Sequence, residues 1–528
     1  MKKIFGLAGA ALVLAIGTGC SKEDFNINKN PNQPTDSTVT HDVILPAALH
    51  GTGAVIASNW GWLQNWMGYW ARSGSYAPNF TEETYNITTG FQVGTWNSLY
   101  NNTYDYQVMQ NKARLADAAF YEGIARIMKA HNFQILVDVY GNVPYFEALK
   151  GSGNVTPKYD RGVDIYQDLF RQIDTGIALI RSSNLRLRQN AGYSENDIMF
   201  GGTDTTTQKR MWRKFGNTLK LRMLVHLHNG GVHGAQSVVA GINIAEEVAK
   251  IAADGSGFLN AGENAEVNPG YRSDKPNPFY ATYVADAAGS ATTGSAYYRA
   301  NNWAITYYGF NNDPRRSYFY SAVNGQYRGV PYGQPPVSET AATLSGIGSG
   351  LTGGSSGYRR KQWILLATES LFLQAEAQQR GILSGNAKST LQAAITESMT
   401  WLGVANPVQA AADYLSDNAG YPDVDYDAPS IVAGQPGGGL YTILSQKMFA
   451  LNGIAPYEVW TDVRRTDILY GAAVGYNPGP PISVSPNNTA TRVPTRLLYP
   501  QTEYNYNSAN VSAQGAIDRY SRVFWDLN

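Results

Sequence analysis

The chain has 528 residues, with 41 Lys and Arg balanced by 41 Asp and Glu, and charged residues make up only 16% of it. A chain without excess positive charge has no global field to attract nucleic acid, so we expect no nucleic-acid partner. Aromatic residues reach 12%, with 35 Tyr, and 54 Gly accompany them. This mixture favours a loop-rich, hydrogen-bonding surface that carries large planar side chains.

The N-terminus has the pattern of a secretory signal. Lys2 and Lys3 precede an apolar run over 4–16, which is too short to span a bilayer and is followed by small residues and Cys20. Cys20 is the only cysteine of the chain, so it cannot form an internal disulfide. The pattern resembles a bacterial lipoprotein signal, in which residues 1–19 would be cleaved off and the Cys20 sulfur would receive a lipid anchor such as palmitate.

A polar segment with Pro31 and Pro34 follows Cys20. This composition is typical of a linker rather than of a packed element. We therefore predict a lipidated tether over 20–38, which holds the body off the membrane, and one domain over 39–528. The first residues of the tether, SKEDF, resemble the short acidic tag of surface lipoproteins that Bacteroidetes-type bacteria export to the outer leaflet.

The first part of this domain contains the aromatic stretch NWGWLQNWMGYW over 59–70. Trp62, Trp66 and Trp70 recur at helical spacing, with Tyr69 beside them, and predict one aromatic stripe along a helix. Such a stripe is ordinarily a buried face, yet indole and phenol rings also offer the flat apolar surface and polar tip of a binding site. We interpret Trp62 and Trp66 as mainly packing residues.

Helical patterns recur along the rest of the chain. Apolar residues repeat at helical spacing in four segments, and each repeat is followed by Gly, Asn or Pro. The segments are 124–135, 212–226, 364–375 and 440–451. They predict a mainly α chain with helices over its whole length.

The region 254–360 differs, because it is rich in Gly, Ser, Asn, Pro and Tyr and shows no sustained period. Long irregular segments cost ordering entropy and are often functional, so this insertion is the first place where we expect a ligand surface. Sugar recognition requires aromatic faces that cover pyranose C–H groups, and amide or guanidinium groups that bond to hydroxyls. The stretch 297–320 contains both kinds of group, although its aromatic side chains could instead be buried against the helical body. Its candidate ligand-binding residues are Arg299, Asn302, Trp303, Tyr307 and Tyr308.

The sequence contains partial matches to catalytic and metal-binding motifs, but none of them has the features that its function requires. Ser355 in GGSSG lacks the strand and helix that flank a nucleophile elbow. Asp138 and Glu147 form one of many conceivable carboxylate pairs, and we interpret them as helix-terminus and packing residues. The acidic DVDYD over 423–427 starts like a calcium loop, yet Ala428 occupies the position that needs Gly. We expect a non-enzyme without metal or other cofactor, and the sequence leaves calcium open.

Several blocks of sequence carry a family pattern. In their order along the chain, they resemble blocks of the SusD/RagB-like outer-membrane nutrient-binding lipoproteins. The resemblance implies a mainly α scaffold of tetratricopeptide-like helix pairs, decorated with long irregular loops. The blocks are DVYGNVPYFEAL (138–149), WRKFGNTLKLRMLVH (212–226), NDPRRSYFY (312–320), ATESLFLQAEAQQRG (367–381), SQKMFALNGIAPYEVWTDVRRTDI (445–468) and RLLYPQTEYNYNSANV (496–511).

The resemblance also implies a function. Such proteins are lipid-anchored at the outer membrane, face outside, form a lid on a SusC-like TonB-dependent transporter and capture oligosaccharides, or peptides in some members. Their ligand surface is built by loops of the N-terminal region and the central insertion, which adds Trp70 and Tyr76 to the candidates. Our leading hypothesis is a non-catalytic glycan-binding lipoprotein. The alternatives are a peptide-binding member of the family, a glycoside hydrolase, and a subunit that only stabilises the barrel.

Overall fold

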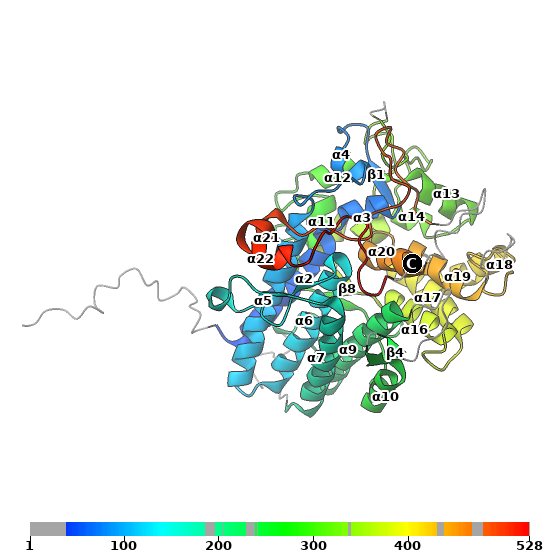
Figure 1. Cartoon of the computed structure of the whole chain (residues 1–528). Helices are drawn as coiled ribbons and strands as arrows, with labels where there is room; N and C mark the ends of the chain where they lie inside the picture. The colour runs from blue at the N-terminus through cyan, green and yellow to red at the C-terminus, as the bar shows by residue number, and fades with distance from the viewer. Residues whose placement is uncertain are drawn as a thin grey trace, which may run out of the picture. The chain divides into compact units, whose positions relative to one another are not determined.

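Helices dominate the part of the chain that the computed structural model describes, and the strands there are short (Figure 1). The predicted signal peptide over 1–19, the lipidation site Cys20 and the tether over 20–38 lie outside the described residues. The mainly α fold class predicted from the sequence is confirmed. The described residues are 39–184, 196–202, 204–228, 238–239, 241–335, 339–429, 438–466 and 479–526.

The N-terminal half of the domain is a row of long helices, each packed against the next (Figure 1). Only residues 116–118 separate α5 from α6, which makes them a tetratricopeptide-like antiparallel pair. α6 contacts α5 and α7, and α7 contacts α9. The row consists of α2 (His41–Ser58), α5 (Val93–Leu115), α6 (Ala119–Tyr140), α7 (Gly162–Ser182) and α9 (Thr205–Leu227), with the shorter α10 (Ile244–Asp254) packed on α9.

Hydrophobic periodicity explains why this row forms. α7 buries Ile165, Leu169, Ile173 and Ile177, which recur every four residues on one face. α6 is buried on nearly all sides because it lies between α5 and α7. Burying a side chain of this size contributes about 1.5–3 kcal/mol, so packing rather than helix propensity holds the row together.

Two glycines allow the close approach of α6 to α7. An added Cβ at Gly123 would lie 2.6 Å from the Gly176 carbonyl oxygen, and one at Gly176 would lie 2.8 Å from the Gly123 carbonyl oxygen. Each glycine therefore faces the backbone of the other helix, which cannot swing aside as a flexible side chain can. A side chain at either position would push the two helices apart.

The C-terminal half contains a second helical group, which meets the first row where α16 contacts α9 (Figure 1). Within the group, α16 contacts α17 and α19, and α17 contacts α18. The predicted helix over 440–451 corresponds to α19. The group consists of α16 (Ala367–Gln379), α17 (Ala387–Leu402), α18 (Pro407–Asp417), α19 (Gly439–Ala450) and α20 (Pro456–Thr466).

One predicted helix begins later than expected. The pattern predicts a helix from residue 364, but Gln362–Leu365 forms strand β8 and α16 begins only at Ala367. β8 pairs antiparallel with β6 (Ala265–Val267), and all four of its residues are buried. A short apolar run fits a buried strand as well as a helix, and here the distant partner strand decides between them.

The region 254–360 is built from short elements rather than from one long loop. They are β6, α11 (Pro278–Tyr283), α12 (Thr293–Tyr297), β7 (Tyr298–Ala300), α13 (Asn302–Phe310), α14 (Arg316–Phe319), α15 (Ser349–Thr352) and the 3-10 helix η2 (Gly354–Arg359). In Figure 1 most of them gather above the long helices, together with elements from the N-terminal region. The remaining short elements are α3 (Gly61–Trp66), β1 (Trp70–Arg72), α4 (Phe80–Glu83), β2 (Val143–Pro144), η1 (Gly151–Gly153), β3 (Tyr159–Asp160), β4 (Val238–Val239), β5 (Ile242–Asn243), α21 (Gln501–Tyr506) and α22 (Ser508–Ser512).

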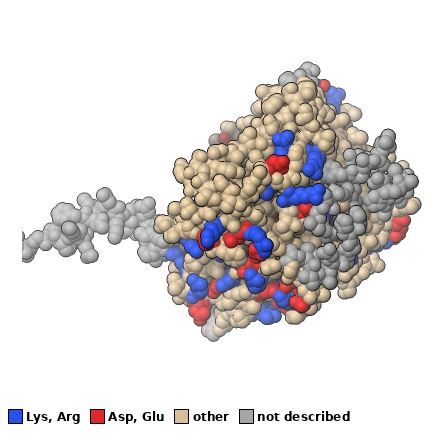
Figure 2. Space-filling model, in the orientation of Figure 1, with Lys and Arg blue, Asp and Glu red and all other residues tan. Residues whose placement is uncertain are grey.

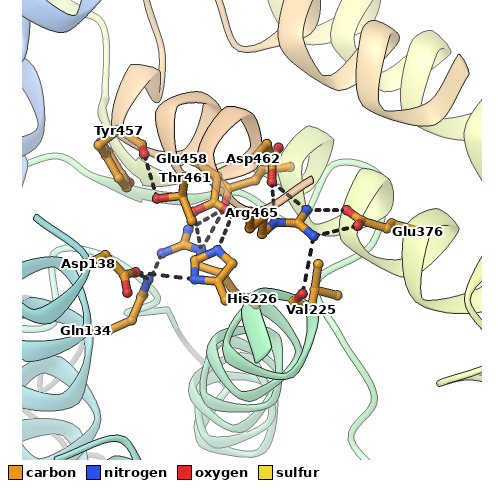
Figure 3. A network of polar contacts seen from close by, with 12 residues as sticks. Gln134, Asp138, Val225, His226, Glu376, Tyr457, Glu458, Thr461, Asp462 and Arg465 are labelled. Atoms are coloured by element: carbon orange, nitrogen blue, oxygen red, sulfur yellow. Dashed lines mark hydrogen bonds and ion pairs between the residues drawn. The ribbon is translucent and has the colours of Figure 1, made fainter. Parts of the chain in front are cut away.

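Buried charges join the two helical groups (Figure 3). Glu458 of α20 lies 2.9 Å from Nε2 of His226 on α9 and 3.2 Å from Nζ of Lys447 on α19. Nδ1 of His226 lies 3.3 Å from Asp138 of α6, so this histidine bridges two carboxylates. All four side chains are buried. Removing one partner of such a group leaves an unpaired buried charge, which costs about 3–5 kcal/mol.

A second part of the same network lies beside it (Figure 3). Arg465 of α20 pairs with Glu376 of α16 at 2.7 Å and with Asp462 on its own helix at 2.5 Å. Nearby, the Arg222 guanidinium of α9 pairs with Glu369 of α16. Together with the Glu458 cluster, these ion pairs fix the positions of five helices relative to one another: α6, α9, α16, α19 and α20.

The histidine in this network titrates far from its ordinary range. Burial by itself lowers the pKa of His226, but the carboxylates of Glu458 and Asp138 outweigh burial and raise that pKa from 6.5 to about 9. His226 is therefore charged in the folded protein at neutral pH, and its charge supports the contact between α6, α9 and α20.

We predict that His226→Gln removes a pH-dependent part of the stability. His226 titrates near pH 6.5 when unfolded and near 9 when folded, so its contribution of roughly 3 kcal/mol is complete below pH 6.5 and is lost as the pH rises through 9. In denaturant unfolding, the free energy of unfolding of the wild-type protein should be lower at pH 10 than at pH 6 by the corresponding amount. In His226→Gln this difference between the two pH values should be smaller.

The control for this comparison is His50→Gln. Burial lowers the pKa of His50, so this residue is neutral in both the folded and the unfolded protein above about pH 8. His50→Gln should therefore keep the wild-type loss of stability as the pH rises through 9. Equal losses of stability in the wild-type protein and in His226→Gln would show that the network does not hold His226 in its charged form.

We also predict that Gly123→Ala destabilises the protein by about 1–3 kcal/mol, because the new methyl group meets the Gly176 carbonyl oxygen of α7. This cost should outweigh the better helix propensity of Ala, about 1 kcal/mol. Gly94→Ala is the matched control, since Gly94 also lies in a helix, α5, and an added Cβ there meets nothing within 4 Å. Urea unfolding of both variants checks the prediction, and equal midpoints would contradict it.

Candidate ligand-binding surface

β1 and β7 join two segments that lie far apart in the sequence. They pair antiparallel, with Trp70 opposite Ala300 and Arg72 opposite Tyr298. The chain continues from β1 into the loop over 73–79 and from β7 into α13. We call this strand pair the β1–β7 seam. Every ligand-binding candidate from the sequence lies in the seam or in one of these two continuations.

The aromatic stretch before β1 does not form one continuous helical stripe. α3 ends at Trp66, and Gly68 has a φ of 75°, a left-handed conformation that breaks the helix. An added Cβ at Gly68 would lie 2.8 Å from the Trp303 ring, so the turn also brings α13 close. Trp62 and Trp66 pack on Trp460 of α20, with ring centroids 5.7 and 6.3 Å away. Both are buried, as packing residues are.

Two candidates, Trp70 and Tyr308, have no exposed surface. The Trp70 ring packs on Tyr283 and Tyr298, with centroid distances of 5.1 and 5.3 Å. The Tyr308 hydroxyl donates to the Phe449 carbonyl oxygen at 2.7 Å, inside the core. Contrary to expectation, neither ring presents a face to a ligand, because the seam and α13 close over them. They support the surface from beneath.

Arg299 is also buried, with 8% of its surface exposed. Its guanidinium donates to the carbonyl oxygens of Ser295 and Tyr298, both at 2.7 Å, and of Ala341 at 3.0 Å. Burial lowers the pKa of Arg299. With its donors directed at backbone oxygens, this side chain ties α12 and β7 to the segment around Ala341. At least three of its guanidinium N–H donors are thus taken up by the backbone.

The loop after β1 holds the half-buried Tyr76, whose ring meets that of Tyr297 edge to face at a centroid distance of 5.2 Å. Buried Arg72 fixes this loop. Its Nη1 donates to the Tyr76 carbonyl oxygen at 2.6 Å, and its Nε pairs with Glu83 at 2.6 Å. The loop therefore has a fixed course, with a partly accessible pair of rings at its edge.

α13 carries the remaining candidates. The Asn301 side chain caps this helix by accepting from the Trp303 backbone N–H at 2.9 Å, and Asn302 beside it is exposed. Trp303 and Tyr307 are half-buried and lie one turn apart. Their rings rest on Phe449, with centroid distances of 5.3 Å and 3.3 Å. A rigid core residue thus backs two rings that keep part of their surface accessible.

Two carboxylates beside the seam, Glu82 and Glu83, are buried. Glu82 accepts from Asn65 Nδ2 at 2.6 Å. Burial raises the pKa of Glu82 to about 7, and the hydrogen bond from Asn65 opposes this shift in part. On the face shown in Figure 2, Lys and Arg lie intermixed with Asp and Glu, and large areas carry neither. That face therefore offers no single-sign patch to a polyelectrolyte.

The acidic segment DVDYD forms a turn stabilised by its own surroundings. Asp425 accepts from the backbone N–H groups of Gly420 at 2.8 Å and of Asp427 at 3.0 Å, and Asp427 pairs with Lys388. Within the described ranges, no three His, Cys, Asp or Glu side chains are grouped so that they could hold a metal ion. Nor is any helix of those ranges both long and apolar enough to cross a bilayer.

Sequence reasoning did not nominate Tyr297, although the structure pairs its ring with Tyr76. Tyr297 is the last residue of the short helix α12 and Tyr298 is the first residue of β7, so neither helical nor strand periodicity extends over this pair. The sequence pattern therefore gave no signal that distinguishes Tyr297 from its neighbour. Phe310 and Tyr421, which are 66% and 42% exposed and lie edge to face at 5.7 Å, also gave no signal, because they lie 111 residues apart.

Comparisons with known proteins give the fold a family. Residues 31–500 match the SusD-like family model that is described as starch-binding and associating with the outer membrane. A comparison with curated proteins found no match.

Solved structures share the fold. A SusD homologue from Bacteroides fragilis is 20% identical, with a TM-score of 0.69 over 92% of this chain and 99% of that one. A chitin-binding SusD homologue from Flavobacterium johnsoniae is 21% identical, with a TM-score of 0.70 over 93% and 99%. A SusD-like protein from Bacteroides thetaiotaomicron is 22% identical, with a TM-score of 0.67 over 92% and 99%. With a family match that spans most of its length, the chain belongs to the SusD-like family.

Proposed function

We propose that the protein captures oligosaccharides on the surface formed by Tyr76, Asn302, Trp303 and Tyr307. The observation that carries this proposal is that three partly exposed aromatic rings and one exposed amide lie in the two segments that leave the β1–β7 seam, Tyr76 beyond its Arg72–Tyr298 end and α13 beyond its Trp70–Ala300 end. The family description as starch-binding and the chitin-binding SusD homologue among the structural neighbours support it. Starch and chitin both consist of pyranose rings, whose C–H faces stack on aromatic rings.

The surface is suited to weak, reversible capture. A sugar ring that covers the free part of Trp303 or Tyr307 replaces water on an apolar face, and each such contact contributes on the order of 1 kcal/mol. The Asn302 amide has both donor and acceptor atoms for hydroxyl groups. Phe449 beneath α13 and Arg72 beneath the loop keep the rings in place before the ligand arrives, which limits the entropy lost on binding.

Binding at the cell surface would serve uptake of the oligosaccharide. We propose that the chain is a lipoprotein anchored through Cys20, with residues 1–19 removed and the tether over 20–38 holding the body outside the outer membrane. The captured oligosaccharide would pass intact to a SusC-like TonB-dependent transporter. The family description as associating with the outer membrane supports this location. The proposal requires no cofactor and no bond cleavage.

We predict that Trp303→Ala and Tyr76→Ala each weaken binding of malto- or chito-oligosaccharides by about fivefold or more, which is the loss expected for one stacking contact of about 1 kcal/mol. Isothermal titration calorimetry with the purified protein measures the affinity, and circular dichroism verifies that the variants are folded. Chromatography of the sugar after each titration shows whether it is still intact.

The matched control is Tyr506→Ala, because Tyr506 is an aromatic residue with 78% of its surface exposed and lies on α21, outside the proposed surface. Its affinity should equal that of the wild-type protein. Unchanged affinity in both folded test variants would exclude the proposed surface. Saturable binding of peptides alone would favour the peptide-binding alternative, and cleaved sugar would overturn non-catalytic capture.

A further inference from the structure

A recess of about 440 Å³ lies among α5, α6 and α7, on the row of long helices and away from the β1–β7 seam. Its volume falls in the range of small-molecule sites. It shares no residue with the surface proposed above for oligosaccharides. Its charged lining residues are Lys129, Lys150 and Asp168, and the rings and amides that matter to its chemistry are Tyr104, Tyr145, Phe146, Gln107, Asn111 and Gln172. We call it the Lys129 pocket.

The charge of Lys129 is only partly compensated. Its ammonium group donates to Oε1 of Gln107 and, at 2.8 Å, to Oε1 of Gln110, and it has no ion-pair partner among the described residues. Burial lowers the pKa of Lys129 to about 8, and neighbouring Arg126 adds to this shift. An ammonium group has three donors, and two amide oxygens leave both a donor and a positive charge available to the pocket.

The carboxylate of Asp168 on the pocket wall makes no ion pair with this lysine, and its charge only partly offsets the lowering of the Lys129 pKa. Asp168 accepts from the Tyr145 hydroxyl at 2.6 Å, from Gln172 at 3.1 Å and from Arg171 at 3.1 Å. Its oxygens are therefore occupied by other donors. Arg126 is occupied as well, because it pairs with Glu122 at 2.8 Å. Lys129 is thus a cation of this pocket that makes no ion pair among the described residues, and the exposed Lys150 lines the pocket as a second cation.

Aromatic rings form the outer wall of the pocket. Phe146 is 50% exposed and Tyr104 is 43% exposed. Tyr145 fixes Phe146 edge to face at a centroid distance of 4.9 Å, and Tyr145 itself rests on buried Phe133 at 4.6 Å. The exposed Phe146 ring is therefore held in position by its neighbours, and it lies beside the amides of the lining.

We propose that the Lys129 pocket binds an acidic sugar, one that carries a carboxylate on a pyranose ring, as a uronic acid does. The carboxylate would pair with the free donor of Lys129, and the ring would lie against Phe146 and Tyr104. The amides of Gln107 and Asn111 would meet the hydroxyls. A small carboxylate without a sugar ring would contact only Lys129. An acidic sugar would contact the lysine, the aromatic rings and the amides of the lining.

The test is calorimetric titration of the full chain with digalacturonic acid and, as a neutral counterpart with the same ring skeleton, its dimethyl ester. We expect the acid to bind at least tenfold more tightly than the ester. Lys129→Met should abolish this preference, because it keeps the length of the side chain and removes the charge. Phe146→Ala should weaken both ligands, and since Phe146 is half-exposed this variant keeps the fold.

Two controls separate this site from its alternatives. Lys158→Met removes an exposed cation that is absent from the pocket lining and should leave the preference intact. Trp303→Ala should also leave it intact, so failure of the oligosaccharide surface and failure of the pocket give different results. Equal affinities for acid and ester, or an unchanged preference in Lys129→Met, would overturn the proposal. Equally tight binding of trialanine would overturn the assignment to a sugar.

Discussion

The fold depends on charged side chains that are sealed among five helices. Glu458 faces His226 and Lys447, and Arg465 faces Glu376, all buried. Once these groups leave water, each requires its partner, because an unpaired charge costs more than the folded state can readily lose. The network therefore admits one arrangement of α6, α9, α16, α19 and α20 and excludes sliding of one helix along another.

This constraint reaches the ligand surface through α19. Lys447 of α19 belongs to the network, and the next residues of this helix hold the loop-rich part. The Tyr69 hydroxyl donates to the Met448 carbonyl oxygen, and the Tyr308 hydroxyl donates to that of Phe449. The Phe449 ring also supports Tyr307. The segments on both sides of the β1–β7 seam thus rest on one helix whose position the charges determine.

In our account, different residues therefore support the ligand surface and contact the ligand. Buried Trp70, Tyr308 and Arg299 hold the seam together, while Tyr76 and Trp303 keep part of their rings accessible. The helical row itself offers a different chemistry, since the Lys129 pocket combines an incompletely paired cation with exposed rings. In our account a neutral sugar chain would therefore bind beside the β1–β7 seam, where partly exposed rings lie. An acidic sugar would bind in the Lys129 pocket, where a cation has no ion-pair partner among the described residues.

The sequence predicted the helices well where periodicity was long, as over 124–135, which lies within α6. It failed where a distant partner decides the outcome: the segment over 362–365 became a strand because β6 pairs with it, and the aromatic stripe ended at Gly68 because α13 packs there. For the candidate surface, the sequence identified both segments of the seam. It could not tell Trp70 from Trp303, because composition does not reveal which ring a tertiary contact buries.

Amide hydrogen exchange tests the central claim most directly, namely that the two segments of the seam form one ligand surface. The purified protein is compared without and with a saturating malto- or chito-oligosaccharide. Our account predicts slower exchange in the loop over 73–79 and in α13 together, with the same dependence on ligand concentration. Slower exchange in only one of the two segments, or only in parts of the chain away from the seam, would contradict it.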